Sequence, residues 1–338
     1  MNSSKKKRTF LIIIVLIVSI ILLVFGVIKK QNSNSMKILI VGDSIGEGAG
    51  ASDPSLKWYK YLIPYMKETY NVNLDITNVS MGGNTCYAGY ARVMQLDDED
   101  DYDLAIICYG ENDKYENFSL YYESILRAVS NKYSACRLMT ILESSQRDYT
   151  DKIRTIQSLS EHYDAYVADM IAAFQNSGRS YDELCDDGTH PNDEGQKVYY
   201  ETVKALMDVI YAEKNLMTEQ TVVAVNPVNR EVFFLDNFQY YAFDNFREVD
   251  EYTYELEADI PLSMLGIDYT GIKGINQITI YADGENICDK QIGWENDFTL
   301  RLIETAADEC EAHSAIRIVF SSKEQVENFH GIIINKYQ

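Results

Sequence analysis

The sequence of 338 residues has little positive charge. It contains 30 Lys and Arg against 52 Asp and Glu, which gives a formal net charge of −22. Binding to nucleic acid depends on clustered Lys and Arg side chains that neutralise phosphates. The deficit therefore argues against a nucleic-acid partner, and it also argues against docking of the soluble part of the chain on anionic lipid.

Metal-binding patterns are missing as well. The six cysteines and four histidines form no CxxC pair and no Cys/His cluster with the spacing of a zinc site. The acidic run at residues 97–103 lacks the alternating ligands and the central glycine of a calcium loop, so it is interpreted as a solvated loop. We therefore expect no metal. The chain also has no internal repeat.

The N-terminus carries the one long apolar run. Residues 1–8 end in a basic cluster, and residues 9–28 are almost entirely apolar apart from Ser19 and Gly26. About 20 apolar residues span a bilayer, and basic residues stay on its cytoplasmic side. This pattern predicts a cytoplasmic tail (1–8), a transmembrane signal anchor (9–28) and a polar linker (29–36), with the rest of the chain outside the cytoplasm. A cleaved signal peptide is the alternative.

Two different periodicities divide the remaining chain. Residues 37–216 alternate short apolar strands with amphipathic helices, which is typical of parallel βαβ units in an α/β domain. From residue 217 to 338, apolar residues recur at every second position, as in Ile278 and Ile280 and in the series Phe298, Leu300 and Leu302. That alternation predicts antiparallel strands and a β-sandwich-like accessory domain.

The ends of the predicted parallel strands carry the polar residues that can do chemistry. Ser44 follows the apolar strand at 37–41, and Asp187 and His190 lie in one loop before the last helix of the domain. A serine attacks an ester only when a base removes its proton, and the base needs a carboxylate to orient it. We therefore expect Ser44 to be the nucleophile, His190 the base and Asp187 its carboxylate partner. His162, the other histidine of this domain, falls in a helical segment.

A tetrahedral intermediate also needs donors that face its oxyanion. The backbone N–H groups of Ser44 and Gly83 and the side-chain amide of Asn112 are the predicted donors, since Gly83 and Asn112 also follow predicted strands. Each motif alone has a purely structural explanation. Gly-Asp-Ser and Gly-x-Asn-Asp are common turns, and Asp-x-x-His can be a helix-capping loop. Their order and placement together are far more specific.

This arrangement resembles the SGNH (GDSL) hydrolase family over about residues 37–214. Ser44 matches the nucleophile block of that family, Gly83 the glycine block, Asn112 the asparagine block, and Asp187 with His190 the final block. The resemblance implies a flavodoxin-like α/β/α fold with a parallel sheet, no cofactor, and serine ester hydrolysis through an acyl-enzyme. Family members include lipases, acetyl xylan esterases, other carbohydrate deacetylases and some acyltransferases.

Anchor, motifs and accessory domain together predict a single-pass membrane esterase with an extracytoplasmic catalytic domain. Its expected substrate carries short acyl groups, in particular acetyl, on a carbohydrate. The alternatives are an acyltransferase that modifies a cell-surface glycan, a lipase or thioesterase, and a surface glycan-binding protein. The last alternative rests on a group of C-terminal aromatic residues, for which core packing is the favoured explanation: Phe233, Phe234, Phe238, Tyr240, Tyr241 and Phe243.

Overall fold

The computed structural model describes residues 35–98, 101–216, 226–274 and 276–337. The predicted tail, the predicted anchor at 9–28 and most of the predicted linker lie outside the described residues. Within those four ranges, no helix is both long enough and apolar enough to cross a membrane.

The N-terminal domain is built on a sheet of five parallel strands. Their order is β2-β1-β3-β4-β5, the doubly wound order of flavodoxin-like folds. This sheet confirms the predicted α/β fold class. The strands are β1 (Ser35–Gly42), β2 (Asn73–Asn78), β3 (Leu104–Cys108), β4 (Arg137–Leu142) and β5 (Tyr166–Asp169).

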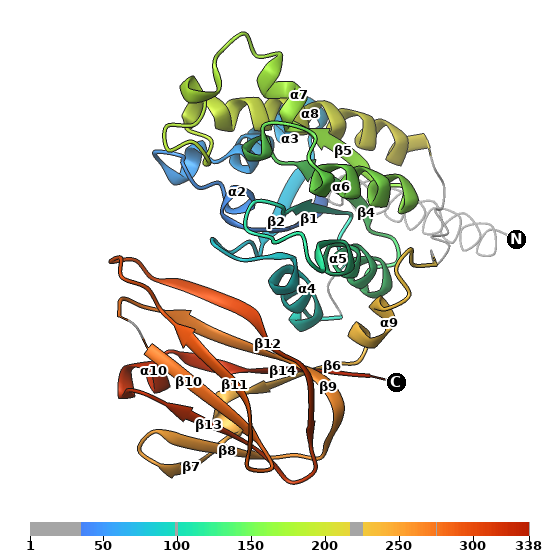
Figure 1. Ribbon diagram of the computed structural model, residues 1–338. Helices are drawn as coiled ribbons and strands as arrows, with labels where there is room; N and C mark the ends of the chain where they lie inside the picture. Colours follow the sequence, from blue (N-terminus) through green and yellow to red (C-terminus); the bar gives the residue numbers. More distant parts are fainter. Residues whose placement is uncertain (1–34, 99–100, 217–225, 275, 338) are drawn as a thin grey trace, which may run out of the picture.

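Helices cover both faces of this sheet (Figure 1). Alternate residues of a strand face opposite sides, so β1 contributes Leu39 and Val41 to one apolar cluster and Ile38 and Ile40 to the other. The first cluster packs against α4 (Cys86–Gln95), α5 (Phe118–Lys132) and α6 (Asp151–His162). The second packs against α3 (Trp58–Tyr70), α7 (Met170–Gln175) and α8 (Asp193–Leu216).

Residues 54–70 form two separate helical segments. Pro54–Leu56 forms one turn of 3-10 helix, and α3 begins at Trp58 after Lys57 adopts an extended backbone. The division has a tertiary cause, because the backbone N–H of Trp58 donates to Oε1 of Gln196 on α8 at 2.9 Å. The start of α3 is thus satisfied by a residue that lies far along the chain.

The C-terminal domain is a sandwich of two antiparallel sheets, as expected from the period-two pattern. One sheet has the order β11-β10-β13-β8-β7 and the other the order β12-β9-β14-β6. The strands are β6 (Phe238–Ala242), β7 (Arg247–Asp250), β8 (Thr253–Glu257), β9 (Ile260–Gly271), β10 (Asn276–Ala282), β11 (Glu285–Ile292), β12 (Leu300–Ala312), β13 (Ala315–Phe320) and β14 (Phe329–Lys336), with short helices α9 (Val232–Leu235) and α10 (Lys323–Glu327).

Phe298 does not belong to the strand that contains Leu300 and Leu302, contrary to the predicted alternation. Its ring stacks on Trp294 with the centroids 4.6 Å apart, and its carbonyl oxygen accepts a hydrogen bond from the indole Nε1 at 2.6 Å. These contacts hold Phe298 in the loop before β12.

The group of C-terminal aromatic residues is shared between the two domains. Tyr241 and Phe243 pack in the sandwich core as expected. Phe234, Phe238 and Tyr240 instead pack against the cluster formed by α4 and α5, and Phe233 is 41% exposed beneath the guanidinium of Arg127. Packing in an apolar core therefore explains five of these six rings. For Phe234, Phe238 and Tyr240, that core is the interface between the two domains.

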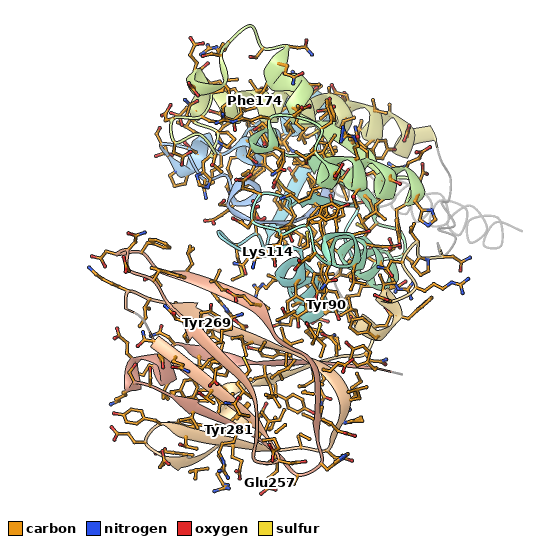
Figure 2. All side chains as sticks on the ribbon, viewed as in Figure 1. Tyr90, Lys114, Phe174, Glu257, Tyr269 and Tyr281 are labelled. Carbon is orange, nitrogen blue, oxygen red and sulfur yellow. The ribbon has the colours of Figure 1, made fainter. Side chains whose placement is uncertain are left out.

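That interface is apolar and closely packed. Met264, Ile303 and Ile333 of the sandwich belong to the same buried cluster as α4 and α5. Figure 2 labels Tyr90 where α4 meets the sandwich; its hydroxyl donates to the carbonyl of Leu235 and accepts from Nδ2 of Asn335 (N–O 2.8 Å). The two domains thus share one apolar cluster at their interface, while each also has a cluster of its own.

Gly266 on β9 tests how tight this interface is. A Cβ at this position would lie 2.3 Å from the hydroxyl oxygen of Tyr87, whose side chain is fully buried. Because the tyrosine has no free space to move into, Gly266→Ala should destabilise the protein by about 1–3 kcal/mol in urea unfolding. Leu262→Ala, at an exposed position on the same strand, should stay within about 0.5 kcal/mol. Equal stability of the two variants would contradict the packing.

Candidate active site

Ser44 lies at the carboxyl end of β1, at the first residue of a short helix, α2 (Ser44–Glu47). Gly42 allows β1 and β3 to approach closely here, because a Cβ on it would lie 2.7 Å from the carbonyl oxygen of Cys108. The next residue, Asp43, donates its N–H to that carbonyl at 3.1 Å and caps α2 by accepting the N–H of Ile45 at 2.8 Å. The serine is therefore fixed by contacts on both of its sides.

The structure brings Ser44, His190 and Asp187 together in one line of hydrogen bonds. Nε2 of His190 lies 2.9 Å from Oγ of Ser44, and Nδ1 lies 2.6 Å from Oδ2 of Asp187. The other carboxylate oxygen of Asp187 accepts the backbone N–H groups of Thr189 and His190 at 2.9 and 2.8 Å. This is the geometry that a serine–histidine–carboxylate relay requires.

Asp187 is held as a carboxylate. Partial burial works against its charge, but the hydrogen bonds from the His190 ring and from the backbone of His190 and Thr189 outweigh it and lower the pKa of Asp187 to about 2. At neutral pH this group is therefore an acceptor, which keeps Nδ1 of His190 protonated and Nε2 free to take the proton of Ser44.

Gln196 on α8 ties the two halves of the relay together, although nothing in the sequence singled it out. Its side-chain nitrogen donates to the carbonyls of Ala49 and Pro191, each at 2.9 Å. These carbonyls lie just after α2 and just after His190. Only the folded arrangement shows this contact, because the residues that it joins are far apart in sequence.

The predicted oxyanion donors gather beside Ser44. Gly83 has a φ of +73° in the turn between β2 and α4, and a Cβ on the neighbouring Gly82 would lie 3.7 Å from the Ser44 Cβ. The amide nitrogen of Asn112, in the loop after β3, donates to Oδ2 of Asp43 at 3.2 Å and to the carbonyl of Asn84 at 3.1 Å. The glycine turn and the amide of Asn112 thus both lie against the Asp43–Ser44 segment.

A group of buried acidic residues lies beneath the serine. Burial raises the pKa of Asp43 to about 8, and the charges of Asp113 and Glu111 add to the effect. Glu143 follows β4 and is completely buried, and this burial, with the nearby Asp43, raises its pKa well above the usual value. Its Oε1 lies 3.4 Å from Sγ of Cys108. In the sequence, the feature that marks Glu143 as a candidate site residue is its position directly after the apolar segment 138–142.

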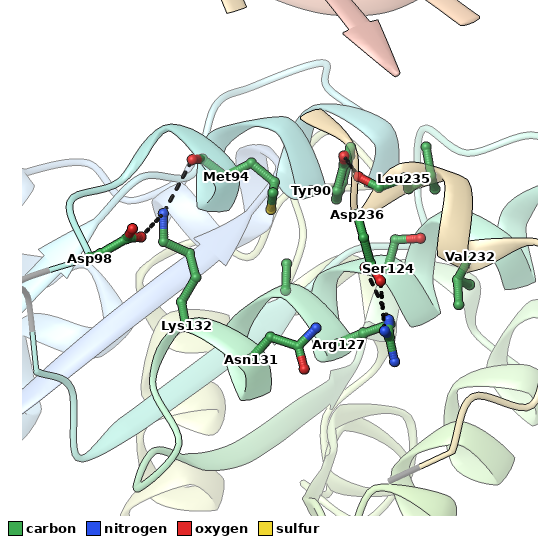
Figure 3. Close-up of a pocket in the computed structure, with 11 residues that line it drawn as sticks. Tyr90, Met94, Asp98, Ser124, Arg127, Asn131, Lys132, Val232, Leu235 and Asp236 are labelled. Atoms are coloured by element: carbon green, nitrogen blue, oxygen red, sulfur yellow. Dashed lines mark hydrogen bonds and ion pairs between the residues drawn. The ribbon is translucent and has the colours of Figure 1, made fainter. Parts of the chain in front are cut away.

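A separate hollow of about 480 Å³ lies between α4, α5 and α9 (Figure 3). Both cations that line it have carboxylate partners: Arg127 pairs with Asp236 at 2.6 Å, and Lys132 pairs with Asp98 at 2.8 Å. None of the relay residues lines this hollow. Across the described part of the chain, no three His, Cys, Asp or Glu side chains gather as metal ligands would.

Comparisons with known proteins agree with this architecture. Residues 40–198 match the model of the GDSL-like Lipase/Acylhydrolase family. A two-domain esterase (CEX) active on acetylated mannans, co-crystallized with mannopentaose, has a TM-score of 0.72 at 15% identity, and the match covers 93% of this chain and 95% of that chain. The same esterase in a second structure has a TM-score of 0.68 at 16% identity, with the same coverage. The two-domain fold is therefore shared.

A catalytic mutant of Axe2, an acetylxylan esterase from Geobacillus stearothermophilus, matches a smaller share of this chain. It covers 50% of this chain and 93% of that chain, with a TM-score of 0.43 at 17% identity. No curated protein sequence matches the chain.

Glu143 generates a prediction about stability and pH. In an unfolded chain a glutamate loses its proton near pH 4.3, as an approximate reference value, whereas in this fold the raised pKa keeps the proton bound. The stability that this proton contributes is complete below the unfolded pKa and is lost as pH rises toward the folded pKa. Relative to Glu143→Gln, the wild type should become less stable as the pH rises above about 5, by at most about 1.4 kcal/mol per pH unit.

Chemical unfolding at several pH values in this range measures the difference. Parallel stability profiles for the wild type and Glu143→Gln would mean that Glu143 is not the group that holds the extra proton. Glu161→Gln, at an exposed position on α6, is the control and should follow the wild type.

Proposed function

The N-terminal domain belongs to the GDSL-like lipase/acylhydrolase family and is a serine ester hydrolase, and from this premise we propose that the protein removes acetyl groups from a carbohydrate. The observation that carries the catalytic part is the continuous hydrogen-bond relay from Ser44 through His190 to Asp187. The carbohydrate part is supported by the fold likeness, over both domains, to an esterase active on acetylated mannans.

In the first half of the proposed reaction, Oγ of Ser44 attacks the ester carbonyl carbon while Nε2 of His190 takes the hydroxyl proton. Asp187 stabilises the imidazolium that forms. The carbonyl oxygen becomes an oxyanion, which the N–H groups of Ser44 and Gly83 stabilise together with one N–H of the Asn112 amide, released from Oδ2 of Asp43. The bond to the sugar oxygen then breaks, His190 donates its proton to that oxygen, and an acetyl-serine remains.

In the second half, a water molecule replaces the sugar alcohol. His190 takes one proton from the water as its oxygen attacks the acetyl carbonyl, and the same donors hold the second oxyanion. When the bond to Ser44 breaks, His190 returns the proton to Oγ. The products are the free serine and acetic acid, which ionises to acetate and a proton, so the cycle consumes one water per ester.

Side chains from the C-terminal domain support a small acyl group. A Cβ on Gly83 would meet Leu300 at 2.9 Å and Leu302 at 3.6 Å, so both leucines of β12 crowd the glycine turn. In the proposed reaction the acyl group lies beside this turn, where the two leucines leave little room for a long chain. The crowding favours an acetyl group over the longer acyl chains that a lipase or thioesterase accepts.

The test measures release of acetate from acetylated mannan and xylan, and turnover of aryl esters from acetyl to octanoyl, by the full-length chain. Ser44→Ala should lower the rate at least about 10³-fold, because the nucleophile is lost. Ser55→Ala, at an exposed serine of the neighbouring turn, should keep the wild-type rate. The acetyl ester and the acetylated glycans should be the best substrates.

Three outcomes would contradict the proposal. Full activity of Ser44→Ala would exclude the serine mechanism. A preference for octanoyl esters would indicate a lipase or thioesterase. Acetylation of an added oligosaccharide without release of acetate would identify an acyltransferase, which could use the same three side chains.

We also propose that residues 9–28 anchor the enzyme in the cell membrane with the hydrolase domain outside the cytoplasm. The support is the basic cluster ahead of a long apolar run. In cells that express the full chain, the protein should sediment with membranes, and protease added outside should degrade the domain. Deletion of residues 1–28 should move it to the soluble fraction. Protection of the domain from external protease would contradict the proposed orientation.

A further inference from the structure

The turn Gly82-Gly83-Asn84 contacts both domains. On the N-terminal side, the carbonyl of Asn84 accepts the amide of Asn112 at 3.1 Å, and Gly83 precedes Asn84 directly. Two of the three proposed oxyanion donors are therefore connected to Asn84, one through the chain and one through a hydrogen bond. Any contact that fixes the position of Asn84 therefore also constrains Gly83 and Asn112.

The side chain of Asn84 faces the other way, into the C-terminal domain. Its Nδ2 donates to the carbonyls of Arg301 at 2.8 Å and Gly82 at 3.0 Å, and its Oδ1 accepts the N–H of Ile303 at 3.0 Å. Asn84 is only 2% exposed. β12 is the last strand of its sheet, and among the described residues no strand pairs with its outer edge. The asparagine amide pairs with that edge as a neighbouring strand would.

The edge that Asn84 contacts is itself rigidly placed. The guanidinium of Arg301 makes two hydrogen bonds, of 2.9 and 2.7 Å, to the carboxylate of Asp268 on β9. Asp268 is completely buried and also accepts the hydroxyl of Tyr240 at 3.1 Å. Bidentate pairs of this kind fix orientation as well as distance. The start of β12 is therefore anchored to the centre of its own sheet.

Leu300 adds a second contact from the same strand. Its Cδ1 would lie 2.9 Å from a Cβ on Gly83 and its Cδ2 3.6 Å from a Cβ on Gly82. In Figure 1, β12 belongs to the sheet that faces α4, so it lies close to the turn that precedes this helix. The turn is held between Ser44 on one side and β12 on the other.

We propose that Asn84 is a positioning residue through which the C-terminal domain sets the oxyanion donors of the hydrolase. The accessory domain then contributes to the rate of the reaction without supplying a group that touches the reacting atoms. This inference rests on the proposed function of Ser44, Gly83 and Asn112, and it adds that the turn alone does not hold them at their working positions.

The test compares kcat and KM of Asn84→Ala with the wild type on an aryl acetate, using the full chain. Loss of one oxyanion donor costs about 10²–10³ in kcat, and displaced donors should cost less, about 10–100-fold. KM should change by no more than about threefold, since the transition state loses more than the ground state. The affinity for a boronic acid, which forms a tetrahedral adduct on a serine, should fall in parallel with kcat/KM.

Asn335→Ala is the matched control. Asn335 is also a fully buried asparagine whose amide bridges the two domains, through Tyr90, but it lies on β14 and contacts no part of the glycine turn. It should lower the melting temperature and keep kcat and the boronic acid affinity. Equal losses of kcat in Asn84→Ala and Asn335→Ala, or an unchanged kcat in Asn84→Ala, would overturn the positioning role.

Leu300→Ala covers the case in which Asn84→Ala fails to fold. This half-buried side chain supports the turn from the same strand, so its removal should lower kcat and boronic acid affinity together. Wild-type values for both would then overturn the proposal. Failure of the proposed function would look different, because Ser44→Ala would remain active; the positioning role fails when Ser44→Ala is inactive and Asn84→Ala keeps its kcat.

Discussion

The site depends on the parallel pairing of β1 with β3. Both strands end at the same edge of the sheet, and the N–H of Asp43 continues the pairing one residue further by donating to the carbonyl of Cys108. This bond decides where Ser44 leaves the sheet. The loops after β2 and β3 and the loop before α8 then need only reach that point. The absence of a side chain at Gly42 is what allows the two strands to come so close.

The carboxyl groups of this site differ in the direction of their pKa shifts. Asp187 lies at the surface of its loop, accepts three hydrogen bonds and stays charged. Asp43 and Glu143 lie beneath Ser44, out of contact with water, and burial favours their protonated forms. Asp187 thus provides a negative charge next to His190, whereas the buried Asp43 and Glu143 form a largely neutral layer beneath Ser44. If Asp43 were fully charged, it would compete with the oxyanion for the amide of Asn112.

The parallel sheet could be predicted from the sequence alone, because it depends on local patterns, and the structure places the predicted residues Ser44, His190 and Asp187 in one line of hydrogen bonds. Apolar strands of four to six residues that end in glycine turns are visible in the printed sequence, and Ser44, Gly83 and Asn112 follow such strands. Gln196 and Asn84 were not recognisable, since their partners are about 150 and 220 residues away and nothing local distinguishes them. The split before α3 escaped prediction for the same reason, because the partner of Trp58 is Gln196 on α8. Phe298 escaped prediction for a different reason: its partner Trp294 is only four residues away, but the period-two pattern carries no sign of that local contact.

The apolar cluster that joins α4 and α5 to the sandwich has a consequence for how the chain comes apart. Domains that meet through polar linkers melt independently, whereas domains that share a core cannot lose one half without exposing the other. Met264, Ile303 and Ile333 are buried only while both folds are intact. The two domains are therefore expected to unfold together, in one cooperative transition.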